Sequence, residues 1–212
     1  MVKARTCLVS VLCLLAATAF PRAGQDRLAP ENDNEARLNR LQPPDRVMNI
    51  IGAAAGMNVA EIGAGRGRYV VHLADRVGPE GKVYAEDIDG EALRHLAERC
   101  RRGGFANVET VLGEMADPKL PAGALDLIFV ISSYHHFGDP VALMRNARQA
   151  LKATGLLAIA EWVPAKDGRG EGTTPEKMTA QMEAAGFVLE RIDKSLETSD
   201  LFIYLFRPRT AR

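Results

Sequence analysis

The sequence has few cysteines, and their positions exclude a disulfide framework. Three occur in 212 residues, and two of them, Cys7 and Cys13, lie in the first apolar stretch, which leaves Cys100 alone in the rest of the chain. One cysteine cannot form an internal disulfide, and no histidines, cysteines or carboxylates stand together at the spacing of a ligand set. We therefore expect the hydrophobic core to stabilise the fold, and we expect no bound metal.

Neither sign of charge is in excess. Lysine plus arginine and aspartate plus glutamate number 27 each, so no net positive field would hold nucleic acid or an anionic membrane. Hydrophobic residues make up 47% of the chain, which suffices for the core of one domain, while the length is short for two. These features favour a single globular domain with a small-molecule substrate and without a nucleic-acid partner. Nothing in the sequence indicates an oligomeric state.

The chain also lacks an apolar run long enough to span a membrane. The most apolar run, Cys7–Phe20, follows Lys3 and Arg5 and is shorter than the roughly 20 residues that a hydrocarbon core requires. A basic start, a short apolar run and the small residues of Ala17-Thr18-Ala19 are typical of a secretory signal. We expect residues 1–23 to be a signal peptide and the mature protein to be exported to the periplasm without stable membrane insertion. A membrane-tethered or a cytoplasmic protein remains an alternative.

Beyond residue 39, apolar segments of strand length alternate with longer amphipathic segments. Residues 24–39 are polar with little periodicity and are expected to form a linker, so the domain covers residues 40–212. The alternation predicts a parallel α/β sheet, and two closely spaced strands at the end predict a hairpin at one edge. Strands are expected at 58–62, 82–87, 108–112, 125–131, 156–161, 187–192 and 201–207, and helices near 47–54, 67–77, 90–102, 140–151 and 175–185.

The most specific motif is a strand that ends in a glycine-rich loop, Val59-Ala60-Glu61-Ile62-Gly63-Ala64-Gly65-Arg66-Gly67. Glycine at every second position lets the backbone approach a ligand closely, and the following helix offers unpaired N–H groups to a carboxylate. A dinucleotide fingerprint needs its third glycine one residue later, where Arg68 stands. The spacing therefore disfavours a nicotinamide cofactor.

A second strand ends in carboxylates about 20 residues after the glycine loop, where a Rossmann-like unit holds a ribose. Asp87 is the predicted ribose ligand, since a carboxylate can accept from both ribose hydroxyls, and Ile88 offers an apolar face to adenine. Glu86 and Asp89 are expected beside the site, because neighbouring residues of a strand point in opposite directions.

Together these residues resemble motif I and the following acidic motif of class I S-adenosylmethionine-dependent methyltransferases, with most similarity to the methyltransferase type 11 group. The likeness extends from about Arg40 to Arg207. It implies a Rossmann-like, doubly wound α/β sheet of seven strands in the order 3-2-1-4-5-7-6 with one strand antiparallel, S-adenosylmethionine as cofactor, and methyl transfer to a small molecule. The cofactor-binding residues that it implies are Glu61, Gly63, Gly65, Gly67, Asp87, Ile88, Glu114 and Met115.

Candidates for catalysis follow the fourth expected strand. In methyl transfer the cofactor carries the reactive group, so the protein mainly binds, aligns and excludes water. For an acceptor that must lose a proton, Tyr134, His135 and His136 lie at the carboxyl end of a strand, where open α/β sheets bind ligands. We interpret His136 as the first candidate for a base and His135 as the second; alternatively, either ring packs under the loop. A noncatalytic binding protein of the same fold and an NAD-dependent oxidoreductase are the competing hypotheses.

Overall fold

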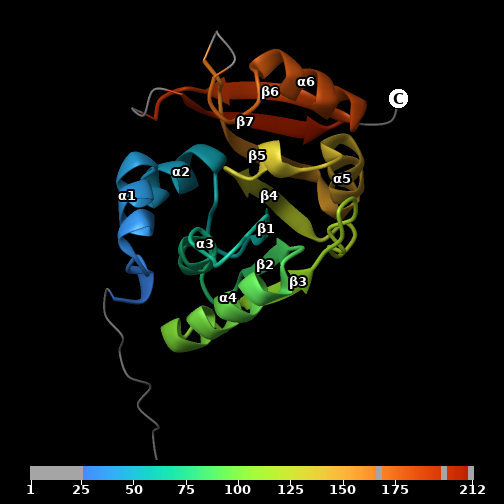
Figure 1. Cartoon of the computed structure of the whole chain (residues 1–212). Helices are drawn as coiled ribbons and strands as arrows, with labels where there is room; N and C mark the ends of the chain where they lie inside the picture. The colour runs from blue at the N-terminus through green and yellow to red at the C-terminus, as the bar shows by residue number, and fades with distance from the viewer. Residues whose placement is uncertain (1–25, 166–168, 197–199, 210–212) are drawn as a thin grey trace, which may run out of the picture.

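The computed structural model describes residues 26–165, 169–196 and 200–209, so the expected signal peptide lies outside the described residues (Figure 1). The strands are β1 (Asn58–Ile62), β2 (Lys82–Asp87), β3 (Val108–Leu112), β4 (Leu125–Ile131), β5 (Leu151–Trp162), β6 (Phe187–Asp193) and β7 (Leu201–Pro208). In the described part of the chain these seven strands form one sheet in the order β3-β2-β1-β4-β5-β7-β6. Strand β7 runs antiparallel to both of its neighbours. The predicted order and the antiparallel last strand are confirmed.

Helices cover both faces of the sheet (Figure 1). They are α1 (Asp33–Leu41), α2 (Pro44–Ile51), α3 (Val70–Val77), α4 (Gly90–Gly103), α5 (Pro140–Ala147) and α6 (Pro175–Ala184), with short 3-10 turns η1 (Asp26–Leu28), η2 (Tyr134–His136) and η3 (Arg148–Ala150). Helix α4 begins where the Asp89 side chain accepts from two backbone N–H groups, and it ends at Gly104 in the left-handed conformation. No helix within the described residues is long and apolar enough to cross a membrane.

The core consists of two hydrophobic layers, one on each face of the sheet. Successive residues of β4 belong to alternate layers: Leu127 and Phe129 pack with α2, α3 and α4, whereas Ile128 and Val130 pack with α5 and α6. All four side chains are buried. A strand that is covered on both faces needs apolar residues at every position, which explains the continuous apolar run in the sequence.

The segment that we expected to be a linker is folded in part. Helix α1 occupies Asp33–Leu41, and the side chain of Asn32 accepts from the backbone N–H of Glu35 at 2.9 Å to cap it. An ion pair between Glu35 and Arg99 of α4, 2.7 Å long and buried at both ends, holds the helix to the domain. Periodicity did not reveal α1 because polar contacts, rather than an apolar stripe, attach it.

Candidate functional site

The glycine loop after β1 is held against the ends of two neighbouring strands. The backbone N–H groups of Gly63 and Ala64 donate to the carbonyl oxygen of Glu86 in β2, at 3.0 and 2.9 Å. Gly63 has a φ of 75°, and a Cβ there would lie 2.7 Å from the side chain of Ser133 after β4. Only glycine permits both the left-handed conformation and this close approach. The loop therefore brings the carboxyl ends of β1, β2 and β4 together.

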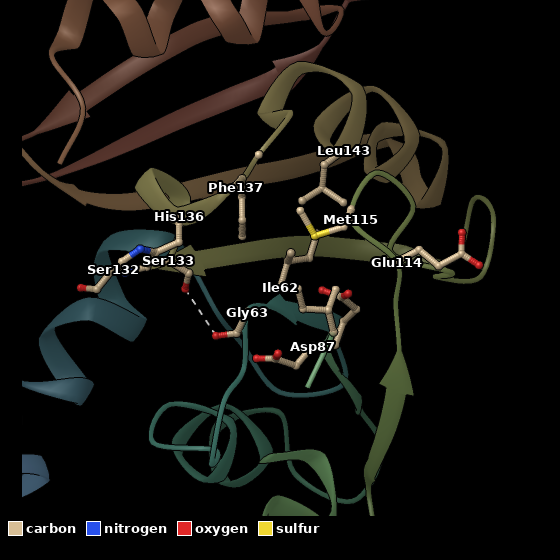
Figure 2. A pocket seen from close by; sticks show the side chains of 13 residues that line it. Ile62, Gly63, Asp87, Glu114, Met115, Ser132, Ser133, His136, Phe137 and Leu143 are labelled. Carbon is tan, nitrogen blue, oxygen red and sulfur yellow. Dashed lines mark hydrogen bonds between the residues drawn. The ribbon is translucent and has the colours of Figure 1, made fainter. Parts of the chain in front are cut away.

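A cavity of about 350 Å³, here called the Asp87 cavity, opens at these strand ends (Figure 2). Its walls include Asp87, Ile88, Met115, His136 and Phe137. The side chains of Ile88 and Met115 are 55% and 61% exposed, so their apolar surface is open to a ligand in the cavity. They provide an apolar surface next to a carboxylate, as a nucleoside requires.

The backbone fixes the carboxylate of Asp87. Its Oδ2 accepts from the N–H of Gly65 in the glycine loop at 2.8 Å, and its Oδ1 accepts from the N–H of Asp89 at 2.9 Å. A carboxylate has about four lone-pair positions, so acceptor capacity remains for a ligand in the cavity. Glu114 lines the same cavity, although its carboxylate also pairs with Lys119 at 3.3 Å.

Glu86 also lines the Asp87 cavity, and our expectation that it would lie beside the site was wrong. Its side chain is buried and occupies the space next to Gly113, where a Cβ would overlap its carboxyl group. Burial, together with the nearby charge of Asp87, raises the pKa of Glu86 to about 8. Strand alternation failed as a guide because the cavity lies beyond the end of β2 and not over one of its faces.

A second cavity of about 330 Å³, the Glu61 cavity, lies on the other side of Gly63. Glu61 and the loop residues Gly65 and Arg66 line it, and α1 forms part of its wall. The Glu61 side chain is 3% exposed, and its Oε2 has no hydrogen-bond partner among the residues that the structure describes. Burial raises the pKa of Glu61 to about 8, although the charge of Arg68 opposes this. A buried, unpaired carboxyl oxygen favours a cationic ligand group.

All but one of the predicted cofactor-binding residues line one of these two cavities. The exception is Gly67, which lines neither. Its φ is 85°, and a Cβ at this position would lie 2.9 Å from Leu96 of α4. Gly67 thus allows the loop to pack closely against α4.

The structure separates the candidates for catalysis. His136 lines the Asp87 cavity (Figure 2). His135 does not: its Nδ1 lies 2.9 Å from the buried carboxylate of Glu161 at the end of β5. Tyr134 is buried and its hydroxyl donates to Gln181 of α6 at 3.0 Å. His136 is therefore the candidate whose ring is available to a ligand in this cavity.

Comparison with known proteins gives a family match over most of the domain. Residues 53–200 match a family model described as a methyltransferase domain. The nocamycin O-methyltransferase of Saccharothrix syringae is 29% identical over 139 residues, which cover 66% of this chain and 50% of that protein. The demethylmenaquinone methyltransferase of Listeria welshimeri is 24% identical over 111 residues, 52% of this chain and 47% of that protein. The chain spans about half the length of the curated relatives that it matches.

Solved structures show the same fold. An S-adenosylmethionine-dependent methyltransferase from Aquifex aeolicus has a TM-score of 0.70 and 27% identity, and the match covers 82% of this chain and 96% of that one. The (4+2)-cyclase SpnF has a TM-score of 0.69 at 16% identity, over 85% of this chain and 86% of that one. At this lower identity the likeness concerns the fold alone. Because SpnF is named as a cyclase, the fold by itself does not imply methyl transfer.

Proposed function

Because the chain belongs to the methyltransferase domain family, whose cofactor is S-adenosylmethionine, we propose that it transfers the methyl group of this cofactor to a hydroxyl group of a small molecule. The observation that carries the proposal is the place of His136. This imidazole lines the same cavity as Asp87, the predicted ribose ligand (Figure 2). A proton acceptor therefore lies on the wall of the predicted cofactor site.

The residues of the two cavities fit the cofactor. Asp87 offers acceptor positions for the ribose hydroxyls, and the exposed side chains of Ile88 and Met115 suit an adenine ring. On the other side of Gly63, the unpaired Oε2 of Glu61 suits the ammonium of the methionine portion. The nucleoside would thus occupy the Asp87 cavity and the amino-acid end the Glu61 cavity.

Within this site the chain has two tasks, alignment and removal of a proton. When bound, S-adenosylmethionine supplies a methyl group on a sulfonium, and the electrons of the breaking C–S bond stay on sulfur. The acceptor oxygen forms the new bond to the methyl carbon, and the imidazole of His136 takes the proton that this oxygen loses. An imidazole is suited to this step because histidine is the side chain that most often serves as a general base in enzymes. Alignment of the two reacting groups supplies the larger part of the acceleration.

Three observations support a small, uncharged hydroxyl compound as acceptor. The charges of the chain balance, so no excess of cations favours a polyanion. Phe137 and Leu143 give part of the Asp87 cavity an apolar wall. The curated relatives include a protein named as an O-methyltransferase.

The test begins with calorimetric titration of the purified full-length chain with S-adenosylmethionine, S-adenosylhomocysteine and NAD. We expect micromolar binding of the first two and none of NAD. Transfer of labelled methyl groups to a panel of phenols and hydroxyquinones then follows. Binding of the cofactor without transfer to any of these acceptors would favour the noncatalytic alternative.

The role of His136 is tested with His136→Ala. We expect a loss of about 100-fold in turnover, the usual contribution of a general base, with S-adenosylhomocysteine affinity unchanged. The loss should shrink for acceptors whose hydroxyl is already ionised at the assay pH, since these need no base. His95→Ala is the matched control, because His95 lies on α4 and pairs with Glu31. Equal turnover by His136→Ala and the native chain would refute the role.

We also propose that residues 1–23 direct export, on the strength of Lys3, Arg5 and the short apolar run that follows them. Cell fractionation followed by N-terminal sequencing tests this. A shortened soluble form in the periplasm is the expected result. An uncut chain in the membrane or cytoplasmic fraction would instead support the tethered or the cytoplasmic alternative.

A further inference from the structure

The two cavities meet at the carboxyl ends of β1 and β4. Gly63, Ser132 and Ser133 line both of them. If the nucleoside half of the cofactor lies with Asp87 and the amino-acid half with Glu61, as the proposed function requires, the sulfur that joins these halves lies beside the three shared residues. The acceptor has to approach the methyl group from the same place.

Ser132 has an uncommon backbone conformation at this point. Its φ is 51°, in the left-handed region that residues other than glycine rarely adopt. Its N–H donates to the carbonyl oxygen of Ala160 in β5 at 2.9 Å, which continues the pairing between the two strands. Strained residues of this kind persist where the surrounding structure imposes them, and they are concentrated at functional sites.

The two neighbouring serines differ in their hydroxyl groups. The hydroxyl of Ser133 donates to the carbonyl oxygen of Ile131 at 2.8 Å and lies 3.4 Å from that of Gly63 (Figure 2). The Oγ of Ser132 is buried and has no hydrogen-bond partner within the described residues. Buried hydroxyl groups in folded proteins nearly always have a partner, and the Ser132 hydroxyl, in a residue that lines both cavities, can take one from a bound ligand.

We propose that the Ser132 hydroxyl donates a hydrogen bond to the acceptor oxygen that receives the methyl, and so aligns this oxygen with the sulfonium. Because a serine hydroxyl carries one donor hydrogen and two lone pairs, it can hold the acceptor oxygen through a lone pair of that oxygen, and it can also accept from an N–H group placed there. The proton of the acceptor oxygen then stays free for His136. His136 lies on the wall of the same cavity, and its imidazole is a stronger base than the serine hydroxyl. The two residues thus divide the work: Ser132 orients the nucleophile, and His136 takes its proton. This role rests on the proposed function.

Sinefungin tests the proposal without knowledge of the natural acceptor. In this analogue a carbon-bound amine replaces the sulfonium methyl, so its N–H groups occupy the place of the transferred group. We expect the native chain to bind sinefungin more tightly than S-adenosylhomocysteine. In Ser132→Ala this preference should fall at least about tenfold, as expected for the loss of a charge-assisted hydrogen bond, while the affinity for S-adenosylhomocysteine stays within about twofold.

Two further variants separate the hydroxyl from the backbone. Ser132→Gly adopts the left-handed conformation without strain and lacks the hydroxyl, so it should lose the preference as Ser132→Ala does. Ser133→Ala should change the affinity for both ligands by the same factor, because its hydroxyl is already bonded to Ile131. A native chain that binds neither ligand would overturn the proposed function. Binding of both, with the sinefungin preference intact in Ser132→Ala and Ser132→Gly, would overturn the role of Ser132 alone.

Discussion

The imidazole of His135 and the carboxylate of Glu161 form a buried pair at the ends of β4 and β5. Nδ1 of His135 lies 2.9 Å from Oε1 of Glu161, and the backbone N–H of the same histidine donates to Oε2 at 3.1 Å. The N–H of Trp162 donates to Oε1 at 2.7 Å. Nε2 of His135 lies 3.7 Å from the exposed carboxylate of Glu171, too far for a hydrogen bond. Glu161 therefore fixes the turn that carries His136.

Replacing Glu161 should destabilise the fold. Glu161→Ala leaves two backbone N–H groups and a histidine ring without their acceptor in a fully buried position, and we expect a loss of about 3 kcal/mol in the free energy of unfolding. Glu161→Gln should lose less, since its one carbonyl oxygen still accepts. Chemical denaturation measures both.

The matched control is Glu176→Ala, because Glu176 is an exposed residue in the first turn of α6. Its replacement should leave the denaturation midpoint nearly unchanged. A Glu161→Ala variant as stable as the native chain would show that the buried pair does not stabilise the turn.

A second prediction concerns Asp87. Asp87→Ala removes the acceptor expected for the ribose and should weaken S-adenosylmethionine binding by about 1–3 kcal/mol, the usual range for charge-assisted hydrogen bonds. The affinity of Asp87→Asn for S-adenosylmethionine should lie between those of the native chain and Asp87→Ala, because the asparagine keeps one acceptor oxygen. Calorimetric titration gives the affinities, and Asp193→Ala, on the distant β6, serves as control. Unchanged affinity in Asp87→Ala would remove this residue from the site.

The sheet could be predicted because its central strands are covered on both faces. Such a strand is then almost continuously apolar, as residues 127–131 are, and the glycine loop follows the first strand. The positions of Gly63 and Asp87 could also be predicted. Each lies at the carboxyl end of a predicted strand, and the strand end fixes where that residue lies in the fold. Spacing also distinguished this loop from a dinucleotide fingerprint at Arg68, and the family match agrees with that interpretation.

Features that depend on contacts between distant segments could not be predicted. Helix α1 depends on Arg99, which lies far from Glu35 in the sequence. The entry of Glu86 into the cavity depends on the space beside Gly113. Ser132 has no sequence signal of its own, because neither its φ nor its unpaired hydroxyl is visible in a run of two serines. The sequence could name both histidines but could not distinguish the one bonded to Glu161.

The raised pKa of Glu61 predicts that cofactor binding depends on pH. With a pKa of about 8 against an ordinary value of 4.5, the free folded protein keeps this proton at neutral pH. An ammonium group in the cavity favours the ionised carboxylate, so binding should release a proton. Affinity for S-adenosylhomocysteine should then rise by up to about tenfold per pH unit between 6 and 8, and level off above.

The same shift sets the sign of the effect on stability. The unfolded chain ionises Glu61 near pH 4.5 and the folded chain near pH 8, so the stability that Glu61 contributes is full below pH 4.5 and falls as the pH rises through this window. Glu61→Gln should remove the pH dependence of binding, measured by titration calorimetry. In denaturation across the window it should reduce the pH dependence of stability without abolishing it, because the pKa of Glu86 is also raised to about 8. Glu86→Gln is the control for binding and should keep the slope. A slope that persists in Glu61→Gln would assign the proton to another group.

The buried ion pair between Glu35 and Arg99 predicts how α1 is attached. Arg99 also donates to the carbonyl oxygens of Arg66 and Ala29, at 3.5 and 3.4 Å, so it joins α1, α4 and the glycine loop. Arg99→Met leaves a buried carboxylate without its cation and should cost about 3–5 kcal/mol, unless α1 detaches first. Detachment would appear as faster hydrogen exchange in α1 with unchanged exchange in β1 and β4.

The double variant Glu35→Leu/Arg99→Met distinguishes a true ion pair from two independent contributions. Because removal of both charges leaves neither one unpaired, the double variant should recover much of the loss in Arg99→Met, and slow exchange should return to α1. The exposed pair of Arg101 with Glu98, three residues apart on α4, is the control, and Arg101→Met should change neither measurement. The losses in the free energy of unfolding in Arg99→Met and Glu35→Leu could instead simply add in the double variant. Each side chain would then act alone, and α1 would be attached by its other contacts.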